Sequence, residues 1–247
     1  MKKAYFCFYS DLNDLLALNQ REREFPLTFN GRQSVKHLIE SLGVPHTEVE
    51  HIQANGTEID FSYLVRDGDH MQVYPFSGNG AKAGLISLQA PIVGEPHFIL
   101  DIHLGKLARY LRMLGYDTWY RNDYEDPELA RLADQEERIL LSRDRRLLMR
   151  SQVTHGYCIR SLDPKQQLIE VLQRFNLEDY PGPFQRCIRC NSLLEPVSKV
   201  EIEQRLEPLT RKYFDEFHIC PACKQIYWKG SHYERMQRFI HKALHKN

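Results

Sequence analysis

Two pairs of cysteines are the residues whose spacing says most about chemistry. Cys187 and Cys190 form one C-x-x-C pair, and Cys220 and Cys223 form a second. Each pair offers two thiolates from one tight turn, and tetrahedral Zn²⁺ takes four such ligands. A redox-active pair is the weaker alternative, because the motif occurs twice. We therefore predict that the four cysteines hold a structural zinc ion.

Aspartates are the second set of residues with a chemical role. Asp101, Asp123, Asp126, Asp144 and Asp163 each come after a short apolar run. Ligands of an open parallel sheet bind outside the carboxyl ends of its strands, so these carboxylates are expected to converge at one edge. Clustered carboxylates repel one another and are usually stabilised by a cation, of which Mg²⁺ and Mn²⁺ suit them best. Such a site can activate water for attack on a phosphodiester.

Each carboxylate also has a plainer interpretation. Asp126 and Asp163 precede proline, so each is expected to cap a helix, and for Asp126 capping and metal binding can coexist. Asp123 fits a turn. Asp144 lies among arginines in ILLSRDRRLL, where the local alternative is a salt bridge. Asp101 directly follows FIL and has the weakest alternative. The position of Asp144 after a third apolar strand favours a metal ligand.

Basic residues near these carboxylates are candidates for holding phosphate. Arg143 adjoins the third strand, and Lys106 and Arg109 lie near the start of the helix expected after the first. Arginine binds phosphate through paired donors. For Arg109, as for Arg112 and Arg131, a solvated helix face is the alternative interpretation.

The chain after the second cysteine pair is basic and aromatic. From position 220 to the end it carries six Lys/Arg and one Asp/Glu, whereas residues 1–78 carry seven and eleven. Trp228, Lys229 and His232 alternate an aromatic ring with cationic groups, a pattern that suits single-stranded nucleic acid. The alternative for Trp228 is packing on the zinc module.

Strands and helices in alternation must position the aspartates. Four apolar strands are predicted at HFIL, DTWY, RILLS and GYCIR, with helices between them. This order indicates an α/β domain with a parallel sheet and right-handed crossovers. We place this core at residues 97–180 and the zinc module at residues 181–247.

Residues 1–78 are predicted to form a separate α+β domain. Strands at AYFCFY and PLTF precede a helix that Ser34 opens and Gly43 ends, and further strands follow. Two strands, a helix and more strands is a β-grasp order. Residues 79–96 are rich in Gly, Ala and Pro and are predicted to be a linker.

Composition sets broad limits. The 247 residues are 42% hydrophobic and 27% charged, which is ordinary for globular domains. No apolar run approaches the ~20 residues that cross a bilayer. The first residues do not resemble an export signal. We therefore expect a cytoplasmic protein without membrane contact.

The segments LDIHLGKLARYLRMLGYDTWY and NDYEDPELARLADQEERILLSRDRRLL resemble a PIN-like ribonuclease family, the one found at the C-terminus of the Mut-seven mutator exonuclease. The resemblance covers roughly residues 97–235 and includes that family's zinc ribbon. It implies hydrolysis of RNA at Mg²⁺ or Mn²⁺ held by clustered acids. By position these acids are Asp101, Asp126 and Asp144, with Asp123 as a fourth candidate. Ser142 stands where the family commonly has Thr and keeps a hydroxyl.

The segment NGTEIDFSYLVRDGDHMQVYP resembles ubiquitin-like sulfur carriers. Those carriers act through a free C-terminal Gly-Gly, whereas this chain continues through FSGNGAKAG. A sulfur-transfer role is therefore disfavoured, and a module that docks a protein partner is the expectation.

Taken together, these features predict a metal-dependent ribonuclease: a PIN-like α/β core, a zinc ribbon that helps to bind RNA and a β-grasp domain in front. The alternative is a non-catalytic RNA-binding or adaptor protein that works through the zinc ribbon and the β-grasp domain.

Overall fold

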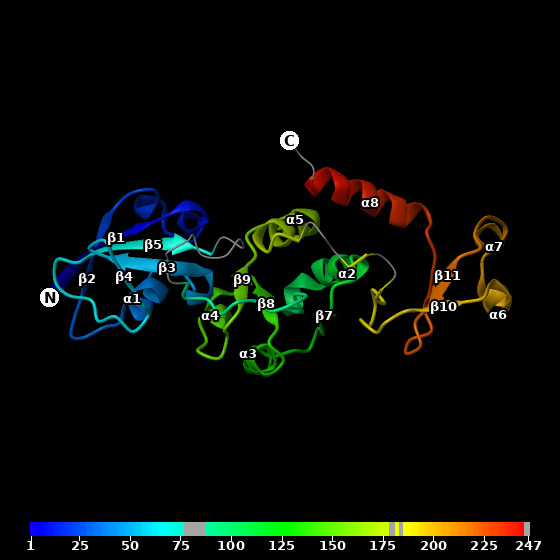
Figure 1. Ribbon diagram of the computed structural model, residues 1–247, viewed down its shortest axis with the longest axis horizontal. Coiled ribbons are helices and arrows are strands. Elements are labelled where there is room, and N and C mark those ends of the chain that lie inside the picture. The colour runs from blue at the N-terminus through cyan, green and yellow to red at the C-terminus, as the bar shows by residue number, and fades with distance from the viewer. Residues whose placement is uncertain (77–86, 178–180, 183–184, 245–247) are drawn as a thin grey trace. The chain divides into compact units, whose positions relative to one another are not determined.

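The computed structural model describes residues 1–76, 87–177, 181–182 and 185–244 (Figure 1). Part of the predicted linker, residues 79–86, and the predicted end of the core at 178–180 lie outside the described residues. The chain divides into two compact units. The first combines residues 1–103 and 122–160, and the second combines residues 104–121 and 161–247.

A five-stranded sheet forms the N-terminal part of the first unit (Figure 1). Its strand order is β2-β1-β5-β3-β4, in which β1 and β5 are parallel and the other pairs antiparallel. The β-grasp prediction is therefore confirmed. The strands are β1 (Lys2–Phe8), β2 (Phe25–Phe29), β3 (Val49–Ala54), β4 (Thr57–Ile59) and β5 (His70–Pro75).

Sequence alternation explains how this domain acquires its core. Along β1 every second side chain is buried, from Ala4 through Phe6 to Phe8. Ser34 caps α1 (Val35–Ser41) by accepting a hydrogen bond from the His37 N–H, as predicted. Short 3-10 helices complete the domain: η1 (Ser10–Leu15), η2 (Leu18–Gln20) and η3 (His46–Glu48).

A parallel sheet forms the rest of the first unit. Strand β8 (Ile139–Ser142) pairs with β6 (Phe98–Leu100) on one side and β9 (Gly156–Cys158) on the other. All three strands are buried along their whole length, as expected for a parallel sheet covered on both faces. Helix α3 (Asp126–Gln135) packs against β6 and β8, and α4 (Arg145–Leu148) packs against β8 and β9.

Two predicted helix starts have different outcomes. Asp163 caps α5 (Pro164–Arg174) by accepting from the N–H groups of the second and third helical residues, as predicted. The N-cap position of α3 belongs to Glu125, whose backbone is extended at φ −95° and ψ 153°. Asp126 is already the first helical residue, so its predicted capping role is wrong. A carboxylate in a first turn still interacts favourably with the helix dipole.

The second unit contains the remaining elements. It includes β7 (Thr118–Trp119), the predicted DTWY strand, and α2 (Gly105–Met113), which follows η4 (Ile102–Leu104) and packs against α5. An antiparallel sheet consists of β10 (Glu195–Val197), β11 (Phe217–Ile219) and β12 (Ile226–Tyr227). Between its strands lie α6 (Lys199–Ile202), η5 (Glu203–Arg205) and α7 (Pro208–Tyr213), and α8 (Ser231–Leu244) comes last. Among the described residues, no helix is long and apolar enough to cross a membrane.

Candidate active site and metal centre

Asp101 lies at the carboxyl edge of the parallel sheet. Its N–H donates to the Leu141 carbonyl at 3.1 Å, which continues the pairing of β6 with β8. Its side chain accepts a hydrogen bond at Oδ2 from the Ser142 hydroxyl at 2.8 Å. Asp101 is 7% exposed and Ser142 is fully buried. The hydroxyl at the end of β8 therefore fixes the carboxylate that follows β6.

The same hydroxyl reaches a second aspartate. The Asp144 N–H donates to Ser142 Oγ at 2.9 Å. Asp144 is exposed and is the N-cap of α4, where its Oδ1 accepts from the Arg146 N–H at 2.8 Å. The described hydrogen bond of the Asp144 carboxylate is therefore with a backbone N–H at the N-terminus of α4 and not with an arginine side chain. From the sequence, Ser142 is expected only to keep the hydroxyl that the family commonly has there, and its contacts with the two aspartates are not predicted. The signal that could have identified Ser142 is a hydroxyl residue at the end of an otherwise apolar strand.

The other two aspartates lie at and just before the start of α3. Asp126 is half-buried at the start of α3, which leads into β8, so the N-terminal end of α3 lies toward the carboxyl edge. Asp123 is exposed just before it. Among the described residues, the four cysteines are the group of candidate metal ligands that lies close together, within 4.8 Å of one another. One Ser142 hydroxyl links Asp101 to Asp144, and the convergence of these two carboxylates with Asp126 stays a prediction.

The arginines beside Asp144 differ in direction. Arg143 is exposed. Arg145 is half-buried, and its Nη1 donates to the carbonyls of Leu15 at 2.6 Å and Gly43 at 3.4 Å. The Arg145 guanidinium thus binds backbone carbonyls of the N-terminal domain. Arg143 is therefore the better candidate to bind phosphate.

Helix α2 carries the other predicted phosphate-binding residues. Lys106 and Arg109 are exposed. Arg112 is only 3% exposed, so the solvated-face interpretation is wrong for it. Its Nε donates to the Thr118 carbonyl at 2.9 Å and its Nη1 to the Arg189 carbonyl at 3.0 Å. The multiple donors of one guanidinium tie α2 to the turn of the first cysteine pair.

Four thiols form a compact cluster in the second unit. The Sγ atoms of Cys187 and Cys223 are 3.5 Å apart, and those of Cys190 and Cys220 are 3.4 Å apart. All four sulfurs lie within 4.8 Å of one another and none is in a disulfide. Tetrahedral Zn–S bonds of about 2.3 Å separate sulfurs by about 3.8 Å. The cluster fits a metal ion such as zinc.

The two cysteine pairs share one backbone turn. In the first, the Asn191 N–H donates to the Cys187 carbonyl at 2.9 Å, and in the second the Lys224 N–H donates to the Cys220 carbonyl at 2.9 Å. Asn191 has φ 71° and Lys224 has φ 59°, so the residue after each pair is left-handed. This repeated turn points both thiols of each pair to one point.

The thiols of Cys190 and Cys223 differ in pKa. Burial opposes the thiolate of Cys190, but hydrogen bonds with Ser192, Cys220 and Cys187 together outweigh burial and lower the pKa of Cys190 to about 6. Burial raises the pKa of Cys223 to about 12. The Tyr227 hydroxyl lies 3.1 Å from Cys187 Sγ, where it can donate to a thiolate. Because a metal ion replaces thiol protons, such a cluster binds metal in competition with acid.

Trp228 belongs to the core of this module. Its ring is tilted against Phe214 and Phe217, with centroids 6.4 Å apart in both contacts. The packing interpretation is therefore confirmed. Trp228 also lines a cavity of about 290 Å³, together with aromatic, apolar and polar side chains. These include Met113, Arg186, Ile188, Tyr227 and Tyr233.

Lys229 and His232 are the other predicted RNA-binding residues near Trp228. Lys229 Nζ lies 3.2 Å from Glu216 Oε2, in an exposed ion pair that costs little to exchange for a phosphate. The side chain of His232 lies outside the described residues. The predicted RNA contacts of Trp228, Lys229 and His232 stay predictions.

Comparison with known proteins now bears on these sites. The family model described as Mut7-C RNAse domain matches residues 96–240. The chain belongs to this family. A second model, Mut7-C ubiquitin, matches residues 1–80. Both resemblances inferred from the sequence are thereby confirmed. No curated protein and no solved structure matches the chain.

Proposed function

We propose that this Mut7-C protein is a ribonuclease that hydrolyses RNA with Mg²⁺ or Mn²⁺ bound at Asp101 and Asp144. Asp126 completes the site, and Asp123 is a fourth candidate ligand. The observation that carries the proposal is the single Ser142 hydroxyl that joins Asp101 to Asp144 at the carboxyl edge of the sheet. Ligands of parallel α/β sheets bind at that edge.

The contacts of the two aspartates leave ligand atoms on both. Ser142 occupies Oδ2 of Asp101, and the α4 cap occupies Oδ1 of Asp144, so each carboxylate keeps a second oxygen for a hard cation. When bound, such an ion activates water and stabilises the leaving oxygen. Arg143, exposed next to Asp144, would bind a phosphate oxygen of the RNA. Lys106 and Arg109 are further candidates for RNA contact.

The remaining assignments support this role. The four cysteines supply all ligands of one tetrahedral Zn²⁺, which makes that site structural and not catalytic. The zinc ribbon and α8 would contact RNA through Trp228, Lys229 and His232. Residues 1–78, 97–180 and 181–247 remain our proposed domains, and the cytoplasm our proposed location. A protein partner of the N-terminal domain stays a prediction.

The decisive test is cleavage by a variant that keeps the local hydrogen bonds. In Asp101→Asn with Asp144→Asn, amide oxygens can still accept from Ser142 and from the α4 N-terminus. We expect Mn²⁺-dependent cleavage of single-stranded RNA to fall about 1,000-fold or more, which corresponds to about 4 kcal/mol of lost transition-state stabilisation. Asp134→Asn, at an exposed position on α3, is the matched control and should cleave at the wild-type rate.

The outcomes separate two functions. A double variant that cuts RNA as fast as wild type would show that the site is assigned wrongly. A wild-type protein that binds RNA in EDTA and cuts none with either metal would be an adaptor instead.

A further inference from the structure

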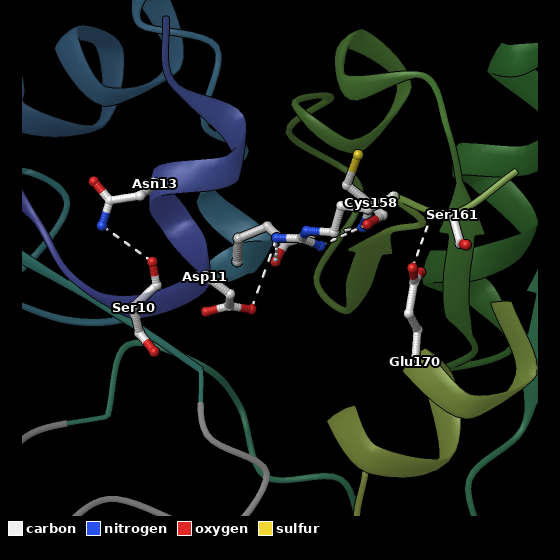
Figure 2. Close-up of polar contacts among 8 residues, drawn as sticks. Ser10, Asp11, Asn13, Cys158, Ser161 and Glu170 are labelled. Carbon is white, nitrogen blue, oxygen red and sulfur yellow. Dashed lines mark hydrogen bonds and ion pairs between the residues drawn. The ribbon is translucent and has the colours of Figure 1, made fainter. Parts of the chain in front are cut away.

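The N-terminal domain and the aspartate-bearing strands belong to one compact unit, residues 1–103 with 122–160. Their contact contains a buried ion pair. Glu48, at the end of η3, is fully buried and accepts hydrogen bonds from the Arg160 guanidinium at 3.1 and 3.2 Å. Its Oε1 also accepts from the Cys158 N–H at 2.6 Å. Asp11 of η1 also belongs to this contact, since its Oδ2 lies 3.8 Å from Arg160 Nη2. Figure 2 shows Asp11 on one side and Cys158, at the end of β9, on the other.

This contact reaches the candidate metal site through the sheet. The Ile159 N–H, next to Cys158, donates to the Ser142 carbonyl at 2.8 Å. Ser142 in turn holds Asp101. A carboxylate of the N-terminal domain thus fixes the end of β9, and β9 fixes the strand end that carries the bridging hydroxyl.

A second contact lies directly beside Asp144. Arg145 follows it in the first turn of α4 and donates from Nη1 to the carbonyls of Leu15 and Gly43. Gly43 has φ +90°, and a Cβ there would lie 3.1 Å from Arg145 Nη1. A side chain at this position would therefore be strained and would crowd the guanidinium. The first residue of α4, next to Asp144, is therefore anchored to the backbone of the N-terminal domain.

A third contact follows α4. His46 Nε2 lies 3.0 Å from the Val153 carbonyl, and His46 Nδ1 lies 2.8 Å from Glu40 Oε1. His46 is only 7% exposed. The segment from Arg145 to Val153 is thus held at both ends by the N-terminal domain.

We propose that Arg145 is a positioning residue, through which the ubiquitin-like domain holds Asp144 ready for the divalent ion. The proposal rests on the proposed role of Asp144 as a metal ligand. A metal ligand whose support is lost has to be ordered when the ion binds, and this lowers affinity. The N-terminal domain then acts as part of the nuclease itself.

The test compares neighbouring arginines in the full-length protein. Arg145→Ala should raise the Mn²⁺ concentration for half-maximal RNA cleavage about 10-fold, with most of the rate recovered at saturating Mn²⁺. Arg145→Lys keeps one donor and should fall between Arg145→Ala and wild type. Arg146→Ala, at an exposed position one residue further, should match wild type. Thermal unfolding of each variant checks that the protein is folded at the assay temperature.

Two further readouts do not need RNA cleavage. Amide hydrogen exchange at residues 142–146 should be faster in Arg145→Ala than in wild type, and direct Mn²⁺ titration should show the same loss of affinity. An active wild type whose Arg145→Ala variant has unchanged Mn²⁺ affinity would overturn the positioning role alone. If wild type binds Mn²⁺ but cuts no RNA, the ribonuclease proposal fails while the titration still judges Arg145. Wild type that binds no Mn²⁺ would overturn both.

Discussion

The cysteine cluster and the aspartate edge are two candidate metal sites built in different ways. The cysteines come from two copies of one short turn, and each turn aims its own two thiols. The aspartates follow separate strands, and the hydroxyl of Ser142 joins Asp101 to Asp144. The first site is closed by local backbone geometry, and the second depends on how the whole first unit packs.

This difference predicts what each site depends on. The ribbon has a small core, in which Ile202, Phe217 and Ile226 are buried, so its stability should rest on the metal. The aspartate edge lies on a well-buried sheet, so its fold should survive without a metal. Its geometry should instead be sensitive to distant residues of the N-terminal domain.

The largest expected effect is the loss of one thiolate. Cys220→Ser should abolish stoichiometric zinc binding and unfold the β10–β12 sheet, because structural Zn²⁺ contributes roughly 10 kcal/mol or more to small modules of this kind. Zinc content by mass spectrometry and amide exchange along β11 measure this. Cys7→Ser is the control, since Cys7 lies outside the cluster and its variant should keep full zinc. Retention of one zinc per chain in Cys220→Ser would contradict a four-thiolate site.

The same contrast explains what the sequence could predict. Paired C-x-x-C motifs, apolar strands and a capping serine are local signals, and Cys187, β8 and Ser34 appear where those signals place them. The role of Ser142 depends on the register between β6 and β8, which no local pattern encodes.

Two arginines show the same limit more sharply. Arg112 has a helical position that fits a solvated face, yet it is buried against carbonyl groups of the first cysteine turn. Arg145 stands beside a candidate ligand, yet its guanidinium binds carbonyls about 100 or more positions earlier in the chain, with sequence separations of 102 and 130. Long-range partners of this kind follow from tertiary packing alone.

An intermediate effect should come from the buried ion pair in the first unit. Glu48→Ala removes the buried carboxylate that accepts from Arg160 and from the Cys158 N–H, whereas Arg160 keeps its ion pair with Asp11 at 3.8 Å and its hydrogen bond to the Cys158 carbonyl. The free energy of unfolding should therefore fall by about 3 kcal/mol, the lower end of the cost of breaking a buried ion pair. Glu48→Gln should fall less, since its amide oxygen still accepts one hydrogen bond. Urea unfolding monitored by amide exchange measures both.

The controls for this pair keep the comparison between the two sites. Glu24→Gln changes an exposed carboxylate of the same domain, which pairs with His70, and should alter stability by less than about 0.5 kcal/mol. Zinc content should be unchanged in all three variants. Loss of zinc from Glu48→Ala would show that the cysteine cluster, like the aspartate edge, depends on how the first unit packs.

The smallest effect should distinguish a capping aspartate from a capping aspartate that also binds metal. Asp163 and Asp144 both cap helices with a side-chain oxygen. Asp163→Ala should cost about 1 kcal/mol of stability and leave RNA cleavage unchanged. Asp144→Ala should cost about the same stability, because the lost cap is of the same kind, yet it should also remove cleavage. Thermal unfolding and cleavage rates at saturating Mn²⁺ measure the two quantities in parallel. Equal cleavage by the two variants would reduce Asp144 to a helix cap, and loss of cleavage in Asp163→Ala would add a carboxylate to the catalytic edge.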